Sequence, residues 1–276
     1  MRSFRLNLSL IALVATAIVT MTPIYWMAMT ATMPTSLILS RNPAFFPDFA
    51  HATLAAFDEV IQRKPFLLWM VNSLVVSVGA SLISLLVAVL AGYSLSRWNF
   101  RSQKILAAIL LFSKLLPAGL VIIPIFIMFN TGGLIDSLPA LVMVNVAFSM
   151  PLACLLMKQF FDRVPRELDE AAMLDGCTWI GALRRVILPL VRPGLASAGM
   201  YLLLVNWSEF LFARTLITSP EKRLLTVGLQ SFSGEYLVDW PALMAVATLT
   251  LVPIAIIFIL LEPFLVSGAT RGAISK

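Results

Sequence analysis

The chain has 276 residues, of which 60% are hydrophobic and 12% charged, and its mean hydropathy is +0.94. Soluble globular domains carry roughly 45–50% apolar and about 25% charged residues, so this composition excludes a soluble domain and indicates apolar surface that faces lipid. The formal net charge of +6 is then a matter of membrane orientation and anionic lipid, and does not indicate binding to nucleic acid.

Long runs without charged residues predict six transmembrane helices. A helix needs about 20 apolar residues to span the hydrocarbon core, and in lipid its backbone groups must bond internally. The predicted spans, in chain order, are about 8–29, 70–95, 105–129, 138–157, 193–214 and 241–263. The sequence lacks the short alternating strands of an outer-membrane barrel. The predicted fold class is therefore an all-α integral membrane protein.

The first apolar run is too long for the core of a cleaved signal peptide, so we expect a retained anchor. We divide the chain into a tail at 1–7, a first helix at 8–29, an external loop at 30–69, a core at 70–266 that includes a loop at 158–192, and a tail at 267–276.

Charge asymmetry predicts the orientation in the membrane. Thirteen positive charges fall on the side of the two tails and the second and fourth loops, and six fall on the other side. Since positive charge accumulates on the inner side, both termini are expected in the cytoplasm of a prokaryotic cell, with the protein in its plasma (inner) membrane. Cys154 and Cys177 lie where thiols stay reduced, and we expect neither a disulfide nor a metal site.

The loop at 158–192 has the pattern of two short helices around a turn. Pro165 suits the first position of a helix, and the acids Glu167, Asp169 and Glu170 suit its positive end. Leu168, Ala171 and Ala172 form a narrow apolar face, and Gly176 provides a stop. A second helix is expected from about 179 to 187, ending at Leu188–Pro189. The residues alone leave open a linker lying on the membrane surface or an element that docks another protein.

Within this loop, the string Glu-Ala-Ala-Met-Leu-Asp-Gly is followed, after nine residues, by Val-Ile-Leu-Pro. The pattern resembles the EAA signature of permeases in ABC importers: Glu-Ala-Ala, three residues, Gly, nine residues, Ile, any residue, Leu-Pro. Val186 stands in place of the isoleucine. The matching residues are Glu170, Ala171, Ala172, Gly176, Leu188 and Pro189.

The resemblance extends along most of the chain and is strongest to the carbohydrate-uptake, MalG-like branch of binding-protein-dependent transport inner membrane components. Trp207-Ser208-Glu209-Phe210 is similar to the Trp-Asn-Glu-Phe of that branch, with Ser208 as a departure. Further similar segments are Asn72-Ser73, Tyr93…Arg97…Phe100, Pro117…Pro124, Gly133-Leu134, the Pro-Arg-Glu-Leu-Asp before the signature, and Val266 to Ala273.

The resemblance implies a type I ABC importer permease fold with six transmembrane helices and a cytoplasmic coupling helix. It implies that the following residues couple the chain to an ATPase: Glu170, Ala171, Ala172, Asp175, Gly176, Leu188 and Pro189. The implied partners are a second, MalF-like permease, a dimer of ATPase subunits, an extracytoplasmic solute-binding protein, a sugar or polyol substrate, and membrane lipid.

The chain itself is not expected to be an enzyme or to bind a cofactor. It contains no GxxxxGK[ST] phosphate-binding loop, so ATP and Mg²⁺ are expected to be used by the partner ATPase. Two alternatives are a stand-alone secondary transporter, which predicts inverted repeats and a carboxylate-rich core, and a scaffold, which needs no docking loop.

Polar residues at membrane depth are candidates for the translocation path or a subunit interface. Lys114 either lines a cavity or extends to the headgroups. Glu209 binds sugar hydroxyls, pairs with a residue of the partner permease or braces a helix kink, and we favour a structural or interface role over sugar binding. Trp207 either stacks on a sugar or anchors the helix at the outer interface. Asn72 and Asn145 can bridge helices.

Overall fold

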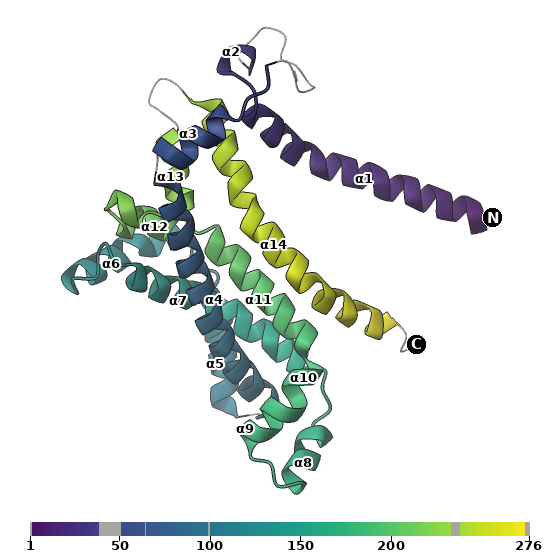
Figure 1. Cartoon of the computed structure of the whole chain (residues 1–276). Coiled ribbons are helices and arrows are strands. Elements are labelled where there is room, and N and C mark those ends of the chain that lie inside the picture. The colour runs from purple at the N-terminus through teal and green to yellow at the C-terminus, as the bar shows by residue number, and fades with distance from the viewer. Residues whose placement is uncertain (1, 39–50, 64, 99, 233–237, 274–276) are drawn as a thin grey trace. The chain divides into compact units, whose positions relative to one another are not determined.

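The computed structural model describes residues 2–38, 51–63, 65–98, 100–232 and 238–273. Its regular structure is helical, as the sequence predicts (Figure 1). Residue contacts divide the chain into two units, one of 1–67 with 227–253 and the other of 68–226 with 254–276. The long helix α14, Trp240–Ala273, contributes to both.

The first unit holds α1 (Arg2–Ala31), α2 (Thr35–Ile38), α3 (Ala55–Arg63), η3 (Leu229–Phe232) and the first part of α14. The side chains of α1 are exposed from residue 9 to residue 26 and become buried only near its end, at Met29 and Ala31. Val60 of α3 and Val246 of α14 are fully buried. The apolar, exposed length of α1 is suited to contact with lipid or with another protein.

The second unit is a bundle built on α4 (Phe66–Arg97), α7 (Leu138–Asp162) and α11 (Arg192–Trp207). Glycines allow these helices to approach closely, as is usual in membranes. A Cβ atom at Gly92 of α4 would lie 2.8 Å from Cβ of Met157 on α7. A Cβ atom at Gly194 of α11 would lie 2.4 Å from Cγ of Phe160 on α7. Helix α7 is therefore clamped between its two neighbours.

The remaining elements of this unit are shorter. They are α5 (Arg101–Ser113), α6 (Ala118–Thr131), α8 (Glu167–Leu174), α9 (Trp179–Ala182), η1 (Leu183–Ile187), α10 (Leu188–Leu190), α12 (Leu211–Leu216), η2 (Pro220–Lys222) and α13 (Leu225–Gly228), whose last two residues belong to the first unit.

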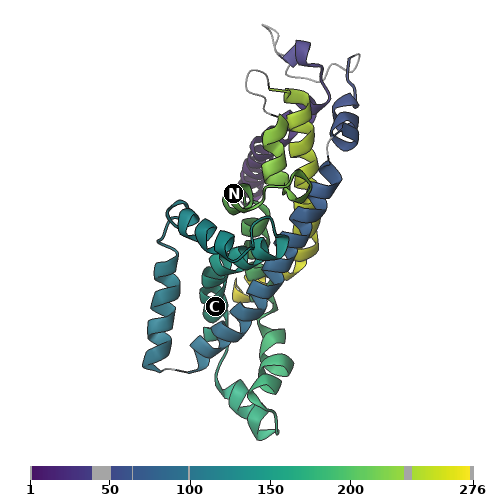
Figure 2. The same cartoon turned by 90° about the vertical axis from the view of Figure 1, so that its left-hand side faces the viewer.

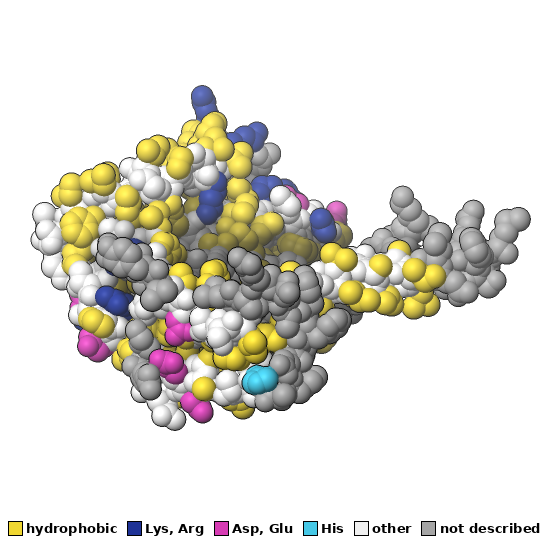
Figure 3. Space-filling view, turned by 90° about the horizontal axis from the view of Figure 1, so that it is seen from above, with side chains coloured by type: hydrophobic (Ala, Val, Ile, Leu, Met, Phe, Trp, Pro, Cys, Tyr) yellow, Lys and Arg dark blue, Asp and Glu magenta, His cyan; other side chains and the backbone are white. Residues whose placement is uncertain are grey.

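Five described helices are long and apolar enough to cross a membrane, and a sixth span results if α5 and α6 are counted as one. These two helices are bent by 100°, so the single helix predicted at 105–129 is wrong (Figure 2). Pro117 disfavours helical geometry at the residue before it, which explains the break. Hydrophobic side chains cover much of the described surface seen in Figure 3, consistent with a chain solvated by lipid.

Candidate functional site

The segment 163–191 forms two short helices around a glycine turn, at the end of the bundle where α4 and α7 end (Figure 1). Helix α8 has Glu167, Asp169 and Glu170 in its first turn, where carboxylates stabilise the exposed backbone N–H groups. Gly176 then adopts φ +85°, and its N–H donates to the carbonyl of Met173 at 3.0 Å. This left-handed conformation is open to glycine at little cost, in agreement with the stop predicted at Gly176.

The two faces of α8 have different surroundings. Asp169 and Ala172 are buried against the chain itself, whereas Glu170, Ala171 and Leu174 are exposed, Leu174 to 90%. Of the apolar face predicted from Leu168, Ala171 and Ala172, the structure exposes Leu168 and Ala171 and buries Ala172. Leu174 belongs to the outer face instead, and its exposure could not be predicted because the sequence does not say which side of so short a helix is covered. Asp175 and Gly176 are also exposed.

The second half of the segment differs from the prediction. Thr178 caps α9, its hydroxyl accepting from the N–H of Gly181 at 3.2 Å. The helix does not end at Leu188–Pro189, because α9 continues as the π-helix η1 and then α10. A proline ring clashes with the carbonyl four residues earlier in an α-helix, and the wider π turn before Pro189 relieves this contact. Leu188 is partly buried and Pro189 exposed.

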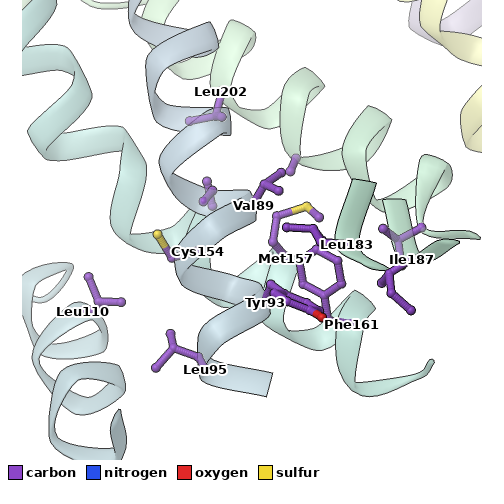
Figure 4. Packing of buried hydrophobic residues seen from close by; sticks show 14 residues of the cluster. Val89, Tyr93, Leu95, Leu110, Cys154, Met157, Phe161, Leu183, Ile187 and Leu202 are labelled. Atoms are coloured by element: carbon purple, nitrogen blue, oxygen red, sulfur yellow. The ribbon is translucent and has the colours of Figure 1, made fainter. Parts of the chain in front are cut away.

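A buried apolar cluster lies beneath this segment. Figure 4 shows Tyr93 of α4 and Phe161 of α7 lying close together, near Leu183 and Ile187 of η1. The rings of Tyr93 and Phe161 are 5.5 Å apart in an edge-to-face arrangement. The π-helix is thus part of the same core as the ends of α4 and α7.

Helix α8 is also held by an ionic cluster that the sequence pattern does not predict. The Tyr93 hydroxyl donates to Oδ1 of Asp169 at 2.5 Å, and Nε of Arg97 lies 2.8 Å from Oδ2. The side chains of Arg97 and Asp169 are only 4% and 3% exposed. The spacing of Tyr93 and Arg97, one helical turn apart, was the available signal, but nothing in the sequence pairs them with Asp169.

A cavity of about 590 Å³ lies in the second unit, between the α5–α6 break, α7 and the α11–α12 break. Lys114, Asn145 and Glu209 line it. The Lys114 ammonium donates to the carbonyl of Phe148, so it faces the protein. Asn145 is 2% exposed, and neither polar atom of its amide has a hydrogen-bond partner among the residues that the structure describes. An unsatisfied buried amide beside a cavity can bind a hydroxyl group.

Glu209 holds the backbone at the break between α11 and α12. Its Oε1 accepts from the N–H of Phe212 at 2.6 Å and its Oε2 from the N–H of Ala213 at 2.9 Å, which caps α12 after the break in the fifth span. The kink predicted as one role of Glu209 is thus present at this residue.

Trp207 and Asn72 are placed elsewhere. Trp207 is 8% exposed and is not among the residues that line the cavity. The Asn72 amide donates to the carbonyls of Glu221 at 2.8 Å and Arg223 at 3.1 Å, so it holds a loop.

Comparison with known proteins agrees with this architecture. Residues 57–271 match the family described as "Binding-protein-dependent transport system inner membrane component". The chain is 34% identical, over 91% of each sequence, to the diacetylchitobiose uptake system permease protein DasC of Streptomyces coelicolor. It is 32% identical to the sulfoquinovosyl glycerol transport system permease protein SmoH of Agrobacterium fabrum, over 91% of this chain and 88% of that protein.

A further relative and a solved structure are also similar to the chain. The maltodextrin transport system permease protein MdxG of Bacillus subtilis is 31% identical over 85% of each sequence. A crystal structure of a bacterial ABC transporter that imports the acidic polysaccharide alginate has a chain with the same fold, with a TM-score of 0.78 at 21% identity, covering 95% of this chain and 98% of that one.

The fold and the family match define a multi-pass permease of the bacterial inner membrane. The chain belongs to the family of binding-protein-dependent transport system inner membrane components, and is a permease subunit of an ABC importer. ATP hydrolysis and solute capture in such a system belong to an ATPase and a binding protein, and the permease itself binds no cofactor.

Proposed function

We propose that this permease imports a carbohydrate or a related polyol, together with a second, MalF-like permease. The observation that carries the proposal is the shared chemistry of the relatives' substrates. The names of DasC, SmoH and MdxG refer to diacetylchitobiose, sulfoquinovosyl glycerol and maltodextrin, all of them carbohydrate compounds. The alternative hypothesis of a stand-alone secondary transporter is no longer supported, because a member of this family works with an ATPase.

The segment 158–192 is the coupling loop in this proposal, and both termini lie in the cytoplasm with it. Glu170, Ala171 and Leu174 form the outer face of α8, which would enter a cleft of one ATPase subunit. Asp175 and Gly176 complete the exposed turn, and Leu188 and Pro189 connect it to α11. An exposed leucine next to a carboxylate suits a protein interface better than a lipid surface, because the carboxylate would be repelled by anionic headgroups.

The cavity lined by Lys114, Asn145 and Glu209 is proposed to lie on the translocation path. Its volume of about 590 Å³ falls in the range of small-molecule sites, roughly 300–1,000 Å³. The free amide of Asn145 would exchange hydrogen bonds with solute hydroxyls. Glu209 would contribute by holding the shape of the wall. Trp207 and Asn72 would support neighbouring helices and loops.

The proposal is tested by deleting the chain from its host and measuring uptake of radiolabelled sugars and polyols. Disaccharides, maltodextrins, sulfonated glycosides and sugar alcohols form the panel, and a labelled amino acid is the control. We expect uptake of one carbohydrate class to be lost and to return when the chain is supplied from a plasmid. Unchanged uptake of every carbohydrate, with loss of amino acid uptake, would contradict the assigned substrate class.

A further inference from the structure

The C-terminal end of α4, which holds Tyr93 and Arg97, binds α8 through buried polar groups. Besides the contacts of Tyr93 and Arg97 with Asp169, Nη1 of Arg97 donates to the carbonyl of Phe161 on α7 at 3.1 Å. Nη2 of Arg166, just before α8, donates to the carbonyl of Ser96 at 2.8 Å. The end of α4 is thus connected by directional bonds to α8 and to the end of α7.

A buried ion pair contributes little net stability compared with apolar residues in the same place. Taking two charges out of water costs about as much as their attraction returns, and apolar residues of the same volume often stabilise as well. Orientation is fixed by the hydrogen bonds from Tyr93 to Asp169 and from Arg166 to the Ser96 carbonyl, which are directional in a way that apolar contacts are not, and the ion pair of Arg97 with Asp169 adds attraction between the two helices. The cluster therefore fixes how α8 sits on α4.

The N-terminal end of α4 forms hydrogen bonds with a second segment, the loop 216–225. Nε1 of Trp69 donates to the carbonyl of Pro220 at 2.8 Å, and Asn72 donates to two further carbonyls of the loop. The Ser73 hydroxyl accepts from the N–H of Leu225 at 2.8 Å. Three side chains within five residues of α4 thus bind the backbone of one loop.

Between these ends α4 is built as a stiff element. Among the five described spans that are long enough to cross a membrane without joining α5 to α6, α4 is the one whose sequence contains no proline. Proline removes a backbone bond and kinks a helix, so its absence favours a straight helix of about 48 Å for 32 residues at about 1.5 Å per residue. The close contact of Gly92 with α7 adds a packed support along its length.

We propose that α4 transmits displacement of α8 to the loop 216–225, with Tyr93, Arg97 and Asp169 as the joint at one end and Trp69, Asn72 and Ser73 as the joint at the other. This rests on the proposed role of α8 as the ATPase-coupling helix. Movement imposed on α8 reaches α4 through the contacts of Asp169 with Arg97 and Tyr93 and through the bond of Arg166 to the Ser96 carbonyl. The three residues at each end are positioning residues, which do not contact solute or nucleotide.

The test uses the whole transporter in liposomes, with its ATPase, second permease and binding protein. Tyr93→Phe removes one hydroxyl. The double variant Arg97→Met, Asp169→Leu removes both charges; leucine has the shape of aspartate, and methionine keeps the apolar stem of arginine. Asp162→Asn is the matched control, because it breaks the exposed pair of Lys158 and Asp162, 2.6 Å apart, at the same end of the bundle. A fluorophore on Glu221→Cys, with the native cysteines replaced by alanine, reports the loop.

Four quantities are measured: ATPase content, basal ATP hydrolysis, its stimulation by loaded binding protein, and the response of the fluorophore to ATP. For the double variant we expect unchanged content and basal hydrolysis, stimulation reduced about fivefold or more, and no fluorophore response. Tyr93→Phe should give a smaller loss of the same kind, and Asp162→Asn none. Should the double variant fail to assemble, Tyr93→Phe decides the question.

Normal stimulation and a normal fluorophore response in an assembled double variant, or in Tyr93→Phe where the double variant does not assemble, would overturn the role of α4. Failure of the coupling assignment gives a different result. In that case, changes on the outer face of α8, such as Glu170→Arg, would leave ATPase content and stimulation intact.

Discussion

At the scale of single residues, Gly176 and Gly119 form a natural contrast. Gly176 has φ +85°, and among the described residues no heavy atom beyond the glycine and its two chain neighbours lies within 4 Å of the position that its Cβ would occupy. Gly119 has the same open surroundings without the positive φ. Any effect of a side chain at Gly176 in the free permease is therefore conformational, and not steric.

Replacing Gly176 by valine is expected to destabilise the turn by about 1–2 kcal/mol, the cost of a left-handed conformation for a residue with Cβ. The ATPase content of the purified transporter should fall, whereas Gly119→Val should retain it. Equal ATPase content in both variants would mean that the turn does not need its observed geometry.

Lys114 is the residue whose role the cavity makes testable. Lys114→Met keeps the apolar stem and removes the donor to the Phe148 carbonyl. We expect several-fold slower solute uptake at normal assembly, because the cavity wall loses its cation. Lys104→Met, on the exposed surface of α5, is the control and should leave uptake unchanged. Normal uptake in Lys114→Met would exclude the cavity role and favour an ammonium that only serves the helix end.

At the scale of elements, α12 depends on a single side chain for its start. Two backbone N–H groups in its first turn donate to the two carboxylate oxygens of Glu209, and the Thr226 hydroxyl donates to the Glu209 carbonyl at 2.6 Å. We expect Glu209→Ala to destabilise the transporter by about 0.5–2 kcal/mol, the usual cost of losing a helix cap. Glu209→Gln keeps one acceptor and should lose less. The melting temperature measures both; a larger loss for Gln than for Ala would contradict capping.

The loop 216–225 is anchored by Asp136 as well as by α4. Burial disfavours the charged form of this carboxyl group, but hydrogen bonds from Ser219, Lys222 and Thr218 outweigh it and hold the pKa of Asp136 below its usual range. Asp136 also has φ +59°, which aspartate and asparagine tolerate better than most residues.

A lowered pKa in the folded state means that ionised Asp136 stabilises the fold above its ordinary pKa of 3.8, and that this contribution is lost as the pH falls below that value. Asp136→Asn keeps the backbone conformation but lacks the charge. The melting temperature of the variant should be lower than that of the unchanged protein at pH 6, and the difference should shrink toward pH 3. A constant difference across this range would rule out the carboxylate as its source.

The sequence predicts elements better than it predicts their interruptions. Apolar runs and the glycine turn identify the spans and α8, because both follow from local composition. The break at Lys114–Pro117 and the π turn before Pro189 were not predicted, since a proline can kink, break or widen a helix depending on what packs around it. Asp169 shows the same limit: its burial depends on Tyr93 and Arg97, some seventy residues earlier in the sequence.

At the scale of the whole molecule, the orientation of the chain in the membrane is a prediction that labelling can test. Charge bias assigns Glu221 to the outside and Arg163 to the inside. In a cysteine-free background, Glu221→Cys should react with an impermeant maleimide in spheroplasts, and Arg163→Cys only in inside-out vesicles. Reaction of both from the same side would refute the topology, and with it the cytoplasmic position of α8.

The exposed length of α1 has a consequence for biosynthesis. Side chains 9–26 are exposed, so folding of this stretch does not wait for a core to form around it. It can leave the insertion machinery and settle in lipid while the rest of the chain is still being translated.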